Sequence, residues 1–280
     1  MQKFSYHTHT VFSDGANTVD EMLTQAVKLG WTEIGISDHM IIHKNIKKVP
    51  YYEFLKAHNQ TNIAYDNFTK ALPVFNCHAA EVRKAAERYP SLKVRVGYEV
   101  DYFTYQGWQS EFEKFRSDLD YDYMLTGNHF FLSDDGEYLL DISCYNSLPE
   151  NEKPEPVEVY VRRHLKTVKR AVESGLFNFL AHADYVRKVK NYNQNLYNSD
   201  YDAIINALAE NNMATELSTK GLRKSDDFFP CHNLLNKITA KNIPLVISDD
   251  AHRCTEVGYM FDKAEKVLSE LKYNNRYILK

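Results

Sequence analysis

Two histidines near the N-terminus have the spacing of paired metal ligands. His7 and His9 lie in a short β-branched and aromatic run, with one residue between them. Side chains two positions apart in a strand face the same side, so both imidazoles can reach one ion. The turn Ser13-Asp14-Gly15 follows and can direct the Asp14 carboxylate towards that face. A single His-x-His motif more often has a structural role. Its interpretation therefore depends on which other metal-binding residues lie close to it in the fold.

Further histidines fall at the ends of strand-like runs. The chain has 11 histidines, and six of them end such runs together with carboxylates. We expect nine side chains to form one metal site: His7, His9, Asp14, His39, Glu99, His129, His182, Asp250 and His252. Each one alone could cap a loop or accept a backbone hydrogen bond. Because they end strands at the same rim, together they predict a site for several metal ions.

The ligand types indicate the chemistry of this site. Nitrogen and oxygen ligands without sulfur suit Zn²⁺, Mn²⁺ or Fe²⁺. Three divalent ions, three carboxylates and one hydroxide would leave a net charge of about +2, which matches the roughly −1.5 to −2 of a phosphate monoester. Metal ions polarise phosphoryl oxygens and lower the pKa of bound water to about 7. The site therefore predicts phosphoester hydrolysis.

Seven strand-like runs, with helical patterns between them, must position these residues. The runs are residues 3–9, 33–37, 93–101, 121–128, 176–182, 213–218 and 243–249. Thr18 to Glu21 has the pattern of a capping box, and Val161, Leu165, Val168 and Val172 follow the stripe of an amphipathic helix. This alternation predicts an α/β fold with parallel strands, a closed or nearly closed β/α barrel of seven units. An open doubly wound sheet is the alternative.

Two stretches interrupt the alternation. Residues 40–75 and about 131–155 are long polar and aromatic insertions, and each follows the carboxyl end of a strand. In β/α barrels that end is the active face, where long loops shape substrate pockets. We expect residues 1–280 to form a single domain with both insertions over the active face.

Composition limits the remaining possibilities. The chain is 44% hydrophobic and 26% charged, with a net charge of −4, which is typical of a globular protein and excludes a polycationic nucleic-acid binder. No apolar run approaches the roughly 18 residues of a spanning helix, and no signal peptide is evident. The 4 cysteines are far apart and form no Cys-x-x-Cys pair. We therefore expect a cytoplasmic protein with no membrane or nucleic-acid partner, and the oligomeric state stays open.

The order of the motifs resembles that of the PHP (polymerase and histidinol phosphatase) superfamily across the whole chain. The resemblance lies in His7-Thr8-His9, Ser37-Asp38-His39, Glu99, His129, Ala181-His182 and Asp250-Ala251-His252. It implies a distorted (β/α)7 barrel of the PHP type with three divalent ions. It also implies that Glu99 bridges two of the ions. The first ion would take His7, His9, Glu99 and Asp250, the second Glu99, His129 and His182, and the third Asp14, His39 and His252.

Within the superfamily, the chain looks most like the monofunctional histidinol-phosphatases of histidine biosynthesis. Residues 216–223, Glu-Leu-Ser-Thr-Lys-Gly-Leu-Arg, resemble a segment of that group, Glu-Leu-Asn-Thr-Ser-Gly-Leu-Arg. The chain departs from the pattern at Ser218 and Lys220. The resemblance implies hydrolysis of a small-molecule phosphate ester, L-histidinol phosphate, to L-histidinol and phosphate, with a metal-bridging hydroxide as the nucleophile.

Three further residues are candidates for substrate contacts. Arg187 and Arg223 lie near strand ends, and a guanidinium fork matches the oxygens of a phosphate. Asp184 could protonate the leaving oxygen or hold a ligand histidine. Together with Glu99, these residues are the predicted catalytic groups.

Two other functions remain open from the sequence. The same superfamily site could serve a phosphoesterase that acts on a nucleotide or a DNA 3′ end, although no basic, aromatic stripe is evident. Alternatively, the chain could be a metal-binding module without turnover. Loss of ligands would favour that function, and all nine predicted ligands are present.

Overall fold

The computed structural model describes residues 1–133, 136 and 139–280, with the backbone alone at residues 143, 144 and 150. The strands are β1 (Glu33–Ile36), β2 (His39–Ile42), β3 (Ala64–Tyr65), β4 (Lys93–Val100), β5 (Tyr123–Thr126), β6 (Phe130–Leu132), β7 (Leu139–Asp141), β8 (Phe179–Leu180), β9 (Ala214–Ser218) and β10 (Leu245–Ser248). The helices are α1 (Val19–Lys28), α2 (Pro50–Ala57), α3 (Phe68–Ala86), α4 (Trp108–Ser117), α5 (Ile142–Tyr145), α6 (Val157–Glu173), α7 (Asn198–Glu210), α8 (Lys220–Lys224), α9 (His232–Ala240) and α10 (Phe261–Glu270).

The central sheet is parallel, as the alternation of elements predicts. Its order is β10-β9-β8-β5-β4-β2-β3, and β1 also pairs with β4. The first half of β4 pairs with β1 and its second half with β2, because Ser37 and Asp38 interrupt the run between them. The predicted strand at residues 33–37 therefore continues as a second short strand. This register places His39 directly opposite Glu99.

Residues 3–9 lie between the two ends of this sheet but do not form the regular strand that we expected. Their one described bridge joins Thr8 to Ala251, beyond the end of β10. On the other side, the N–H of Gly35 in β1 donates to the Ser5 carbonyl at 2.8 Å. The ladder is irregular because Thr8 N–H donates to the Ser37 hydroxyl, a side chain, at 3.0 Å. The α/β fold of the barrel type is confirmed, and this irregular segment lies where a seventh strand would close it.

Both faces of the sheet are buried, which is typical of parallel strands covered by helices. Alternate residues of the strands point to opposite faces: Met124 packs in the large outer core, and Tyr123 and Leu125 pack in a small inner cluster with Phe179 and Val246. Ring atoms of Tyr123 fill the space beside Gly97, and its hydroxyl donates to the Tyr6 carbonyl at 2.7 Å. The inner cluster is thus a packed floor beneath the carboxyl ends of the strands.

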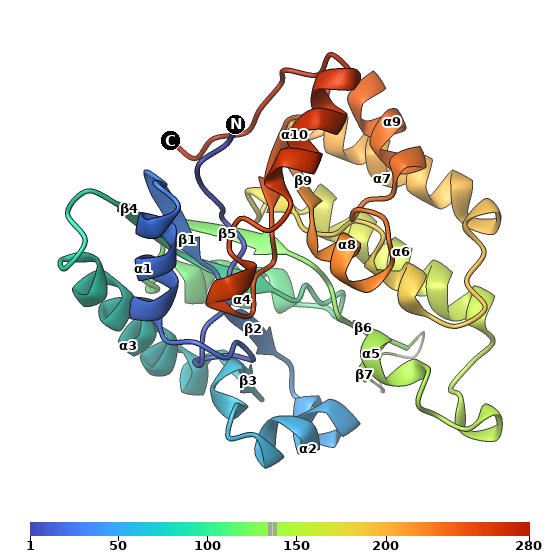
Figure 1. Cartoon of the computed structure of the whole chain (residues 1–280). Coiled ribbons are helices and arrows are strands. Elements are labelled where there is room, and N and C mark those ends of the chain that lie inside the picture. Colours follow the sequence, from blue (N-terminus) through green and yellow to red (C-terminus); the bar gives the residue numbers. More distant parts are fainter. Residues whose placement is uncertain (134–135, 137–138) are drawn as a thin grey trace.

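Helices surround this sheet, and their sequence signals are confirmed. Thr18 and Glu21 form the predicted capping box of α1. The predicted stripe on α6 is buried, and the helix ends before Gly175, which has a φ of +67°. Figure 1 shows α1 and α3 on one side of the sheet and α6, α7 and α9 on the other. Within the described residues, no helix combines the length and apolar character that a membrane span requires.

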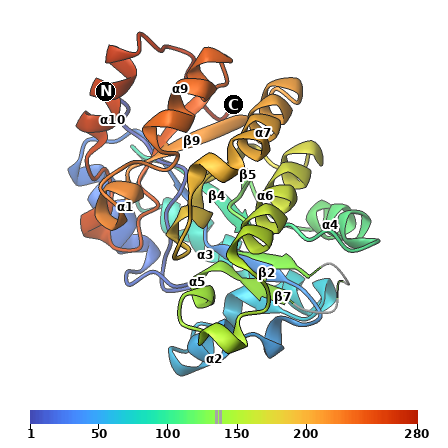
Figure 2. The same ribbon diagram turned by 90° about the vertical axis from the view of Figure 1, so that its right-hand side faces the viewer.

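The two insertions contain secondary structure of their own. Residues 40–75 contain most of β2, α2 and β3 and the start of α3, and residues 131–155 contain β7 and α5. Part of the second insertion, residues 134, 135, 137 and 138, lies outside the described residues. Figures 1 and 2 place α2, α5 and β7 at the same end of the molecule.

Candidate metal centre

The nine predicted ligands converge at the carboxyl ends of the strands. His7 and His9 come from the N-terminal segment, and Asp14 from the turn that follows it. His39 begins β2 and Glu99 lies near the end of β4. The other four follow β5, β8 and β10: His129, His182, Asp250 and His252. His182 and Asp250 have positive φ angles of 21° and 46°, so the chain turns sharply at both positions.

Glu99 lies at the centre of the cluster and is almost fully buried. Its Oε2 lies 3.1 Å from His7 Nε2, 3.4 Å from His9 Nε2 and 3.1 Å from His39 Nδ1, and its Oε1 lies 2.9 Å from His182 Nε2 and 3.7 Å from His129 Nε2. The two oxygens of one carboxylate therefore face two different groups of imidazoles. This is the arrangement that a ligand shared between two ions requires.

Two aspartates complete the cluster. Asp250 Oδ1 lies 3.3 Å from His9 Nε2 and 3.4 Å from His252 Nδ1. Asp14 Oδ1 lies 3.4 Å from His39 Nε2, and its Oδ2 lies 3.2 Å from His252 Nε2. His252 thus connects the two aspartates, and the nine side chains form one continuous set.

Four overlapping groups within the set bring their ligand atoms within 4.8 Å of one another. They are His9, Asp14, His39 and His252; His7, His182 and Asp250; His7, His9 and Glu99; and His39, Glu99 and His129. The first group contains the predicted ligands of the third ion. The other groups divide the remaining ligands differently from the predicted first and second sites, so the assignment of each ligand to an ion stays a prediction.

The chemistry of these side chains fits divalent metal ions. Both ring nitrogens of His9, Oδ1 of Asp250 and Oδ1 of Asp14 are buried with no hydrogen-bond partner among the described residues. Buried polar atoms nearly always have a partner, and those that lack one require an explanation such as an ion. Imidazole nitrogens and carboxylate oxygens without sulfur are the donor set that suits Zn²⁺, Mn²⁺ and Fe²⁺.

The electrostatics of the cluster favour bound cations. Burial, with the neighbouring His252 and His39, lowers the pKa of His9 to about 3, so its imidazole is neutral, as a ligand must be. Burial alone would raise the pKa of Glu99, but the surrounding imidazoles, His7 foremost, hold it well below its usual range. The pKa of His39 rises to about 9 because Asp14 and Glu99 outweigh the effect of burial. The carboxylates thus stay ionised and attract positive charge.

Glu216, which was not among the predicted site residues, bonds to two of the predicted ligands. This fully buried carboxylate on β9 lies 2.8 Å from His7 Nδ1 and accepts a hydrogen bond from the His182 N–H at 2.7 Å. The Ser248 hydroxyl also donates to it at 2.8 Å. By bonding His7 Nδ1, Glu216 fixes the ring so that Nε2 faces the cluster. The available signal was an acidic residue inside an otherwise apolar strand.

Asp38 and Asp101 hold the backbone of the cluster. Asp38 accepts hydrogen bonds from the Thr10 N–H at 2.7 Å and the Ser13 hydroxyl, which orients the turn that carries Asp14. Asp101 accepts from the backbone N–H of His129. Both carboxylates are buried, and neither faces the cluster as one of the candidate ligands.

The predicted phosphate-binding arginines bond to backbone carbonyls. Arg223 donates to the carbonyls of Asp249 and Asp250 at 2.9 and 3.1 Å, so it stabilises the turn after β10. Arg187 donates to the carbonyls of Asp227 and Phe228. Neither side chain lines the cavity over the cluster. Their phosphate-binding role stays a prediction, and the contacts described here are structural.

Asp184 is fully buried beside the same loop. Its Oδ2 accepts a hydrogen bond from the Cys231 N–H at 2.9 Å and lies 3.6 Å from Arg187 Nε. Burial raises its pKa to about 6, against the lowering effect of Arg187. Among the described residues no histidine bonds to it, so Glu216 performs the histidine-orienting role that we expected of Asp184. Its role as a proton donor stays a prediction.

A cavity of about 360 Å³ opens over the cluster. Four predicted ligands line it together with residues of the first insertion and the strand ends: Asp14, His39, His129 and His252, with Ile41, Tyr51, Phe54, His58, Gln60, Phe130, Tyr185 and Lys220. Tyr51, Phe54, His58 and Gln60 of this lining belong to the first insertion, and the placement of both insertions over the active face stays a prediction. Lys220, one of the two departures from the resembled segment, lies at the edge of the cluster, with its Nζ 2.8 Å from Asp250 Oδ2.

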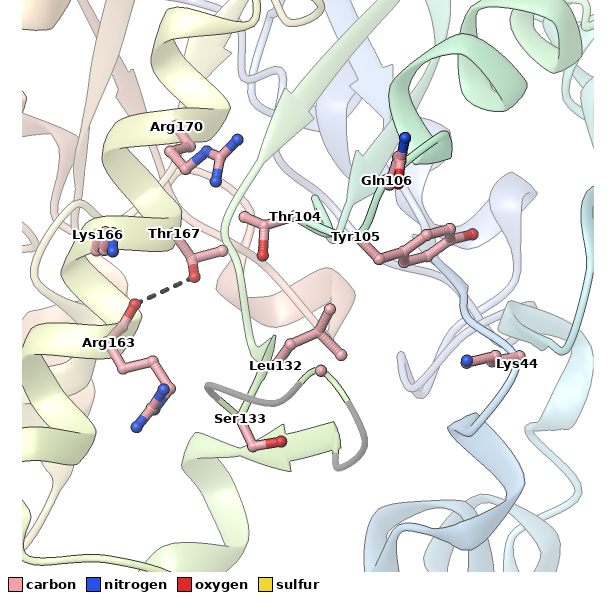
Figure 3. A pocket seen from close by; sticks show the side chains of 11 residues that line it. Lys44, Thr104, Tyr105, Gln106, Leu132, Ser133, Arg163, Lys166, Thr167 and Arg170 are labelled. Atoms are coloured by element: carbon pink, nitrogen blue, oxygen red, sulfur yellow. Dashed lines mark hydrogen bonds between the residues drawn. The ribbon is translucent and has the colours of Figure 1, made fainter.

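A second cavity, of about 460 Å³, contains none of the predicted site residues. Figure 3 shows Arg163, Lys166, Thr167 and Arg170 of α6 on one side of it and Lys44, Tyr105 and Gln106 on the other. Described residues of the second insertion, including Ser133, line this cavity instead of the one over the cluster. The two insertions thus border different hollows.

The chain is similar in sequence to two curated proteins. A histidinol-phosphatase of Bacillus subtilis is 23% identical over an alignment of 288 residues, which covers 94% of this chain and 98% of the relative. A relative from Deinococcus radiodurans is 26% identical over 201 residues, 69% of this chain and 71% of its own length.

A solved structure has the same fold. It is the histidinol phosphate phosphatase of Lactococcus lactis in complex with zinc, L-histidinol and phosphate, with a TM-score of 0.70 and 18% identity over 100% of this chain and 97% of that one. The family model described as the PHP domain matches residues 5–220. This match covers most of the chain and contains seven of the nine converging residues. The other two, Asp250 and His252, follow β10 and lie beyond the matched range. The chain therefore belongs to the PHP domain family.

Proposed function

We propose that the protein is a metal-dependent phosphomonoesterase that hydrolyses L-histidinol phosphate to L-histidinol and phosphate. The observation that carries the proposal is the convergence of nine imidazole and carboxyl groups around Glu99 beneath an open cavity. The name of the Bacillus subtilis relative and the ligands of the Lactococcus lactis structure support this substrate.

The side chains suit three divalent ions. In this proposal Asp14, His39 and His252 hold one ion, and Glu99 is shared between the other two. His7, His9 and Asp250 would complete one of these sites, and His129 and His182 the other. When bound, such ions polarise phosphoryl oxygens and lower the pKa of a bound water towards about 7.

The protein's own residues would position the ligands and the substrate. Glu216 holds His7 with Nε2 towards the cluster, and Asp101 holds the backbone of His129. Tyr51, Phe54 and Tyr185 form an aromatic wall of the cavity, which would lie beside the alcohol part of a bound ester. A cavity of about 360 Å³ suits a small ester.

The test is the release of phosphate from L-histidinol phosphate by the purified protein after incubation with Zn²⁺ or Mn²⁺. Nucleoside monophosphates, a DNA 3′-phosphate and 4-nitrophenyl phosphate serve as competing substrates. We expect the highest kcat/KM for L-histidinol phosphate. Preferred turnover of a nucleotide or DNA would replace the proposed substrate, and turnover of none of them would indicate a non-catalytic metal-binding module.

Glu99→Gln tests the site itself. The substitution keeps the shape of the side chain but removes the charge that faces both groups of imidazoles. We expect turnover to fall by at least about 100-fold and the metal content to fall with it. Glu53→Gln, on an exposed carboxylate that pairs with Lys56, is the matched control and should leave both unchanged. Full turnover by Glu99→Gln would exclude the assigned site.

A further inference from the structure

Lys220 lines the cavity over the cluster but is not one of the nine predicted metal ligands. It stands where the resembled segment has serine, and it lines the cavity together with His129, His252 and Tyr185. Its side chain is 13% exposed, so the ammonium group is largely desolvated but open to the cavity. An ammonium group in this position requires an anion beside it.

The contact with Asp250 leaves this carboxylate free to bind a metal ion. Asp250 Oδ1 faces the imidazoles of His9 and His252 at 3.3 and 3.4 Å, whereas Oδ2 faces Lys220 at 2.8 Å. A carboxylate accepts on both oxygens, so one can meet a metal ion while the other holds the lysine. Lys220 is therefore fixed at the edge of the cluster.

The ammonium group has donors to spare. It carries three N–H donors, and among the described residues Asp250 is the one anionic partner that the structure gives to Lys220. The remaining donors lie beside the cavity that the side chain lines. In contrast, Arg187 and Arg223 use their guanidinium groups on backbone carbonyls of the neighbouring loops. Among the described residues that line this cavity, Lys220 is thus the one lysine or arginine.

The backbone that carries Lys220 is held firmly. The N–H of the preceding Thr219 donates to the Ser248 carbonyl at 2.9 Å, and its hydroxyl donates to the same carbonyl at 3.2 Å. The following Gly221 packs so closely that a Cβ there would lie 2.1 Å from the Asp227 carbonyl oxygen. The backbone at Lys220 is therefore already in place and needs no ordering when its side chain binds a ligand.

We propose that Lys220 binds the phosphate group of the substrate, with its ammonium held between Asp250 and the phosphoryl oxygens. This inference rests on the proposed function only in that the ligand is a phosphate monoester. The residue supplies a cation at a position where the resembled segment has a neutral serine. It therefore strengthens the binding of dianionic esters over that of uncharged or singly charged ligands.

The test is the binding of inorganic phosphate to the metal-loaded protein, measured by calorimetry, for wild type, Lys220→Met, Lys220→Ser and Lys220→Arg. Loss of one charge-assisted hydrogen bond weakens binding by roughly 10- to 100-fold. We expect this increase in Kd for the Met and Ser variants and less than about threefold for Arg, because the Arg variant keeps the charge. Lys224→Met, on the exposed end of the same helix, is the matched control and should bind phosphate as wild type does.

Metal content and kinetics distinguish phosphate binding by Lys220 from an indirect effect through loss of metal. We expect unchanged metal content in all variants and, for the Met and Ser variants, a KM that rises more than kcat falls. An unchanged phosphate Kd in both the Met and Ser variants would overturn the proposal, as would a weakening that follows a loss of metal. Inorganic phosphate carries no alcohol group, so this titration tests Lys220 even if L-histidinol phosphate is not hydrolysed. Turnover of that ester by wild type tests the proposed function separately.

Discussion

At the scale of single residues, the site depends on carboxylates whose two oxygens have different tasks. Glu99 directs one oxygen to His7, His9 and His39 and the other to His129 and His182. Glu216 bonds the ring of His7 with one oxygen and the backbone of His182 with the other. Such divided contacts fix ring orientation and position together, which several ions in one cluster require.

Glu216→Gln should weaken metal binding although residue 216 is not a predicted ligand. The amide cannot accept on both sides, so His7 loses the partner that orients its ring. We expect the affinity for Zn²⁺ to fall by roughly 10- to 100-fold, measured by competition with a chelating dye. Ser248→Ala removes one hydrogen bond to Glu216 but keeps its charge, so it should have a smaller effect. Equal affinities of wild type and Glu216→Gln would show that Glu216 does not orient His7.

At the scale of elements, close packing around Tyr123 determines how β1, β4 and β5 meet. A Cβ on Gly35 would lie 2.1 Å from the Tyr123 hydroxyl oxygen, and a Cβ on Gly97 would lie 2.2 Å from a ring carbon of the same residue. The two glycines therefore let the tyrosine ring lie across their strands, where its hydroxyl reaches the carbonyl of Tyr6. That contact joins the sheet to the segment that carries His7 and His9.

Gly35→Ala and Gly97→Ala should each lower the free energy of unfolding by about 1–3 kcal/mol through overpacking. In a Tyr123→Phe background the cost of Gly35→Ala should shrink, because the closest atom is removed. The cost of Gly97→Ala should persist, because its closest neighbours are ring carbons. Urea denaturation of the single and double variants measures both couplings. An equal cost of Gly35→Ala in the two backgrounds, or a clearly smaller cost of Gly97→Ala in Tyr123→Phe, would contradict this account of the packing.

The α6 helix supports the loop of His129 through a buried histidine. His164 Nε2 lies 2.8 Å from the Asn128 carbonyl oxygen, and Asn128 has a φ of 45° directly before His129. Burial lowers the pKa of His164 to about 3, although the bond to Asn128 opposes this shift. The ring is therefore neutral in the folded protein over a range in which it is protonated in the unfolded chain, whose histidines have a pKa of about 6.5.

This difference predicts acid sensitivity. Below about pH 6.5 the unfolded state binds one proton more at His164, so stability falls with falling pH by up to about 1.4 kcal/mol per pH unit. The loss continues until the pH reaches the folded-state pKa of about 3. Glutamine does not titrate, so the His164→Gln variant lacks this proton uptake on unfolding. Its free energy of unfolding should therefore depend less steeply on pH between 6.5 and 5. Parallel pH profiles of wild type and variant would contradict the buried neutral ring.

At the scale of the whole molecule, the sheet brings residues from both ends of the chain into one buried cluster of charge. The N-terminal segment hydrogen-bonds to Ala251 beyond the last strand, which places His9 beside His252 and Asp250. Divalent ions that bind the folded cluster, and not the unfolded chain, must stabilise the fold through linkage. Metal binding and folding are thus coupled in this account.

Removal of metal should lower the melting temperature. At a free Zn²⁺ concentration 100 times its Kd, one ion adds about 2.7 kcal/mol. For a chain of this size we expect a difference of roughly 5–10 °C between metal-loaded protein and protein treated with a chelator. Differential scanning calorimetry measures the difference, and Glu99→Gln should reduce it. The same melting temperature with and without metal would contradict the binding of metal ions by the folded cluster.

The sequence predicted the cluster better than its surroundings. The nine residues could be found because they lie in or just after strand-like runs of the sequence, and parallel strands end at one rim. Glu216 was missed because an acid inside a strand has no periodic signal. The directions of Arg187 and Arg223 depend on which backbone carbonyls lie nearby, such as that of Asp249, and a sequence does not contain this information.

Some boundaries of helices and strands were predicted from the sequence and others were not. The helical stripes and the capping box of α1 follow from local periodicity and were predicted well. The break between β1 and β2 was not, because it depends on Ser37 and Asp38, whose side chains bond to Thr8 and Thr10 of the N-terminal segment. The extent of a single domain over residues 1–280 stays a prediction.

The most direct test of the central claim is a crystal structure of the protein grown with Zn²⁺ and phosphate, with anomalous diffraction measured at the zinc edge. We predict anomalous peaks inside the cluster, about 2.0–2.2 Å from imidazole and carboxylate atoms, with Glu99 shared between two of them. Phosphate should lie over the peaks and contact Lys220. Zinc peaks elsewhere on the protein, with none among the nine side chains, would contradict the account.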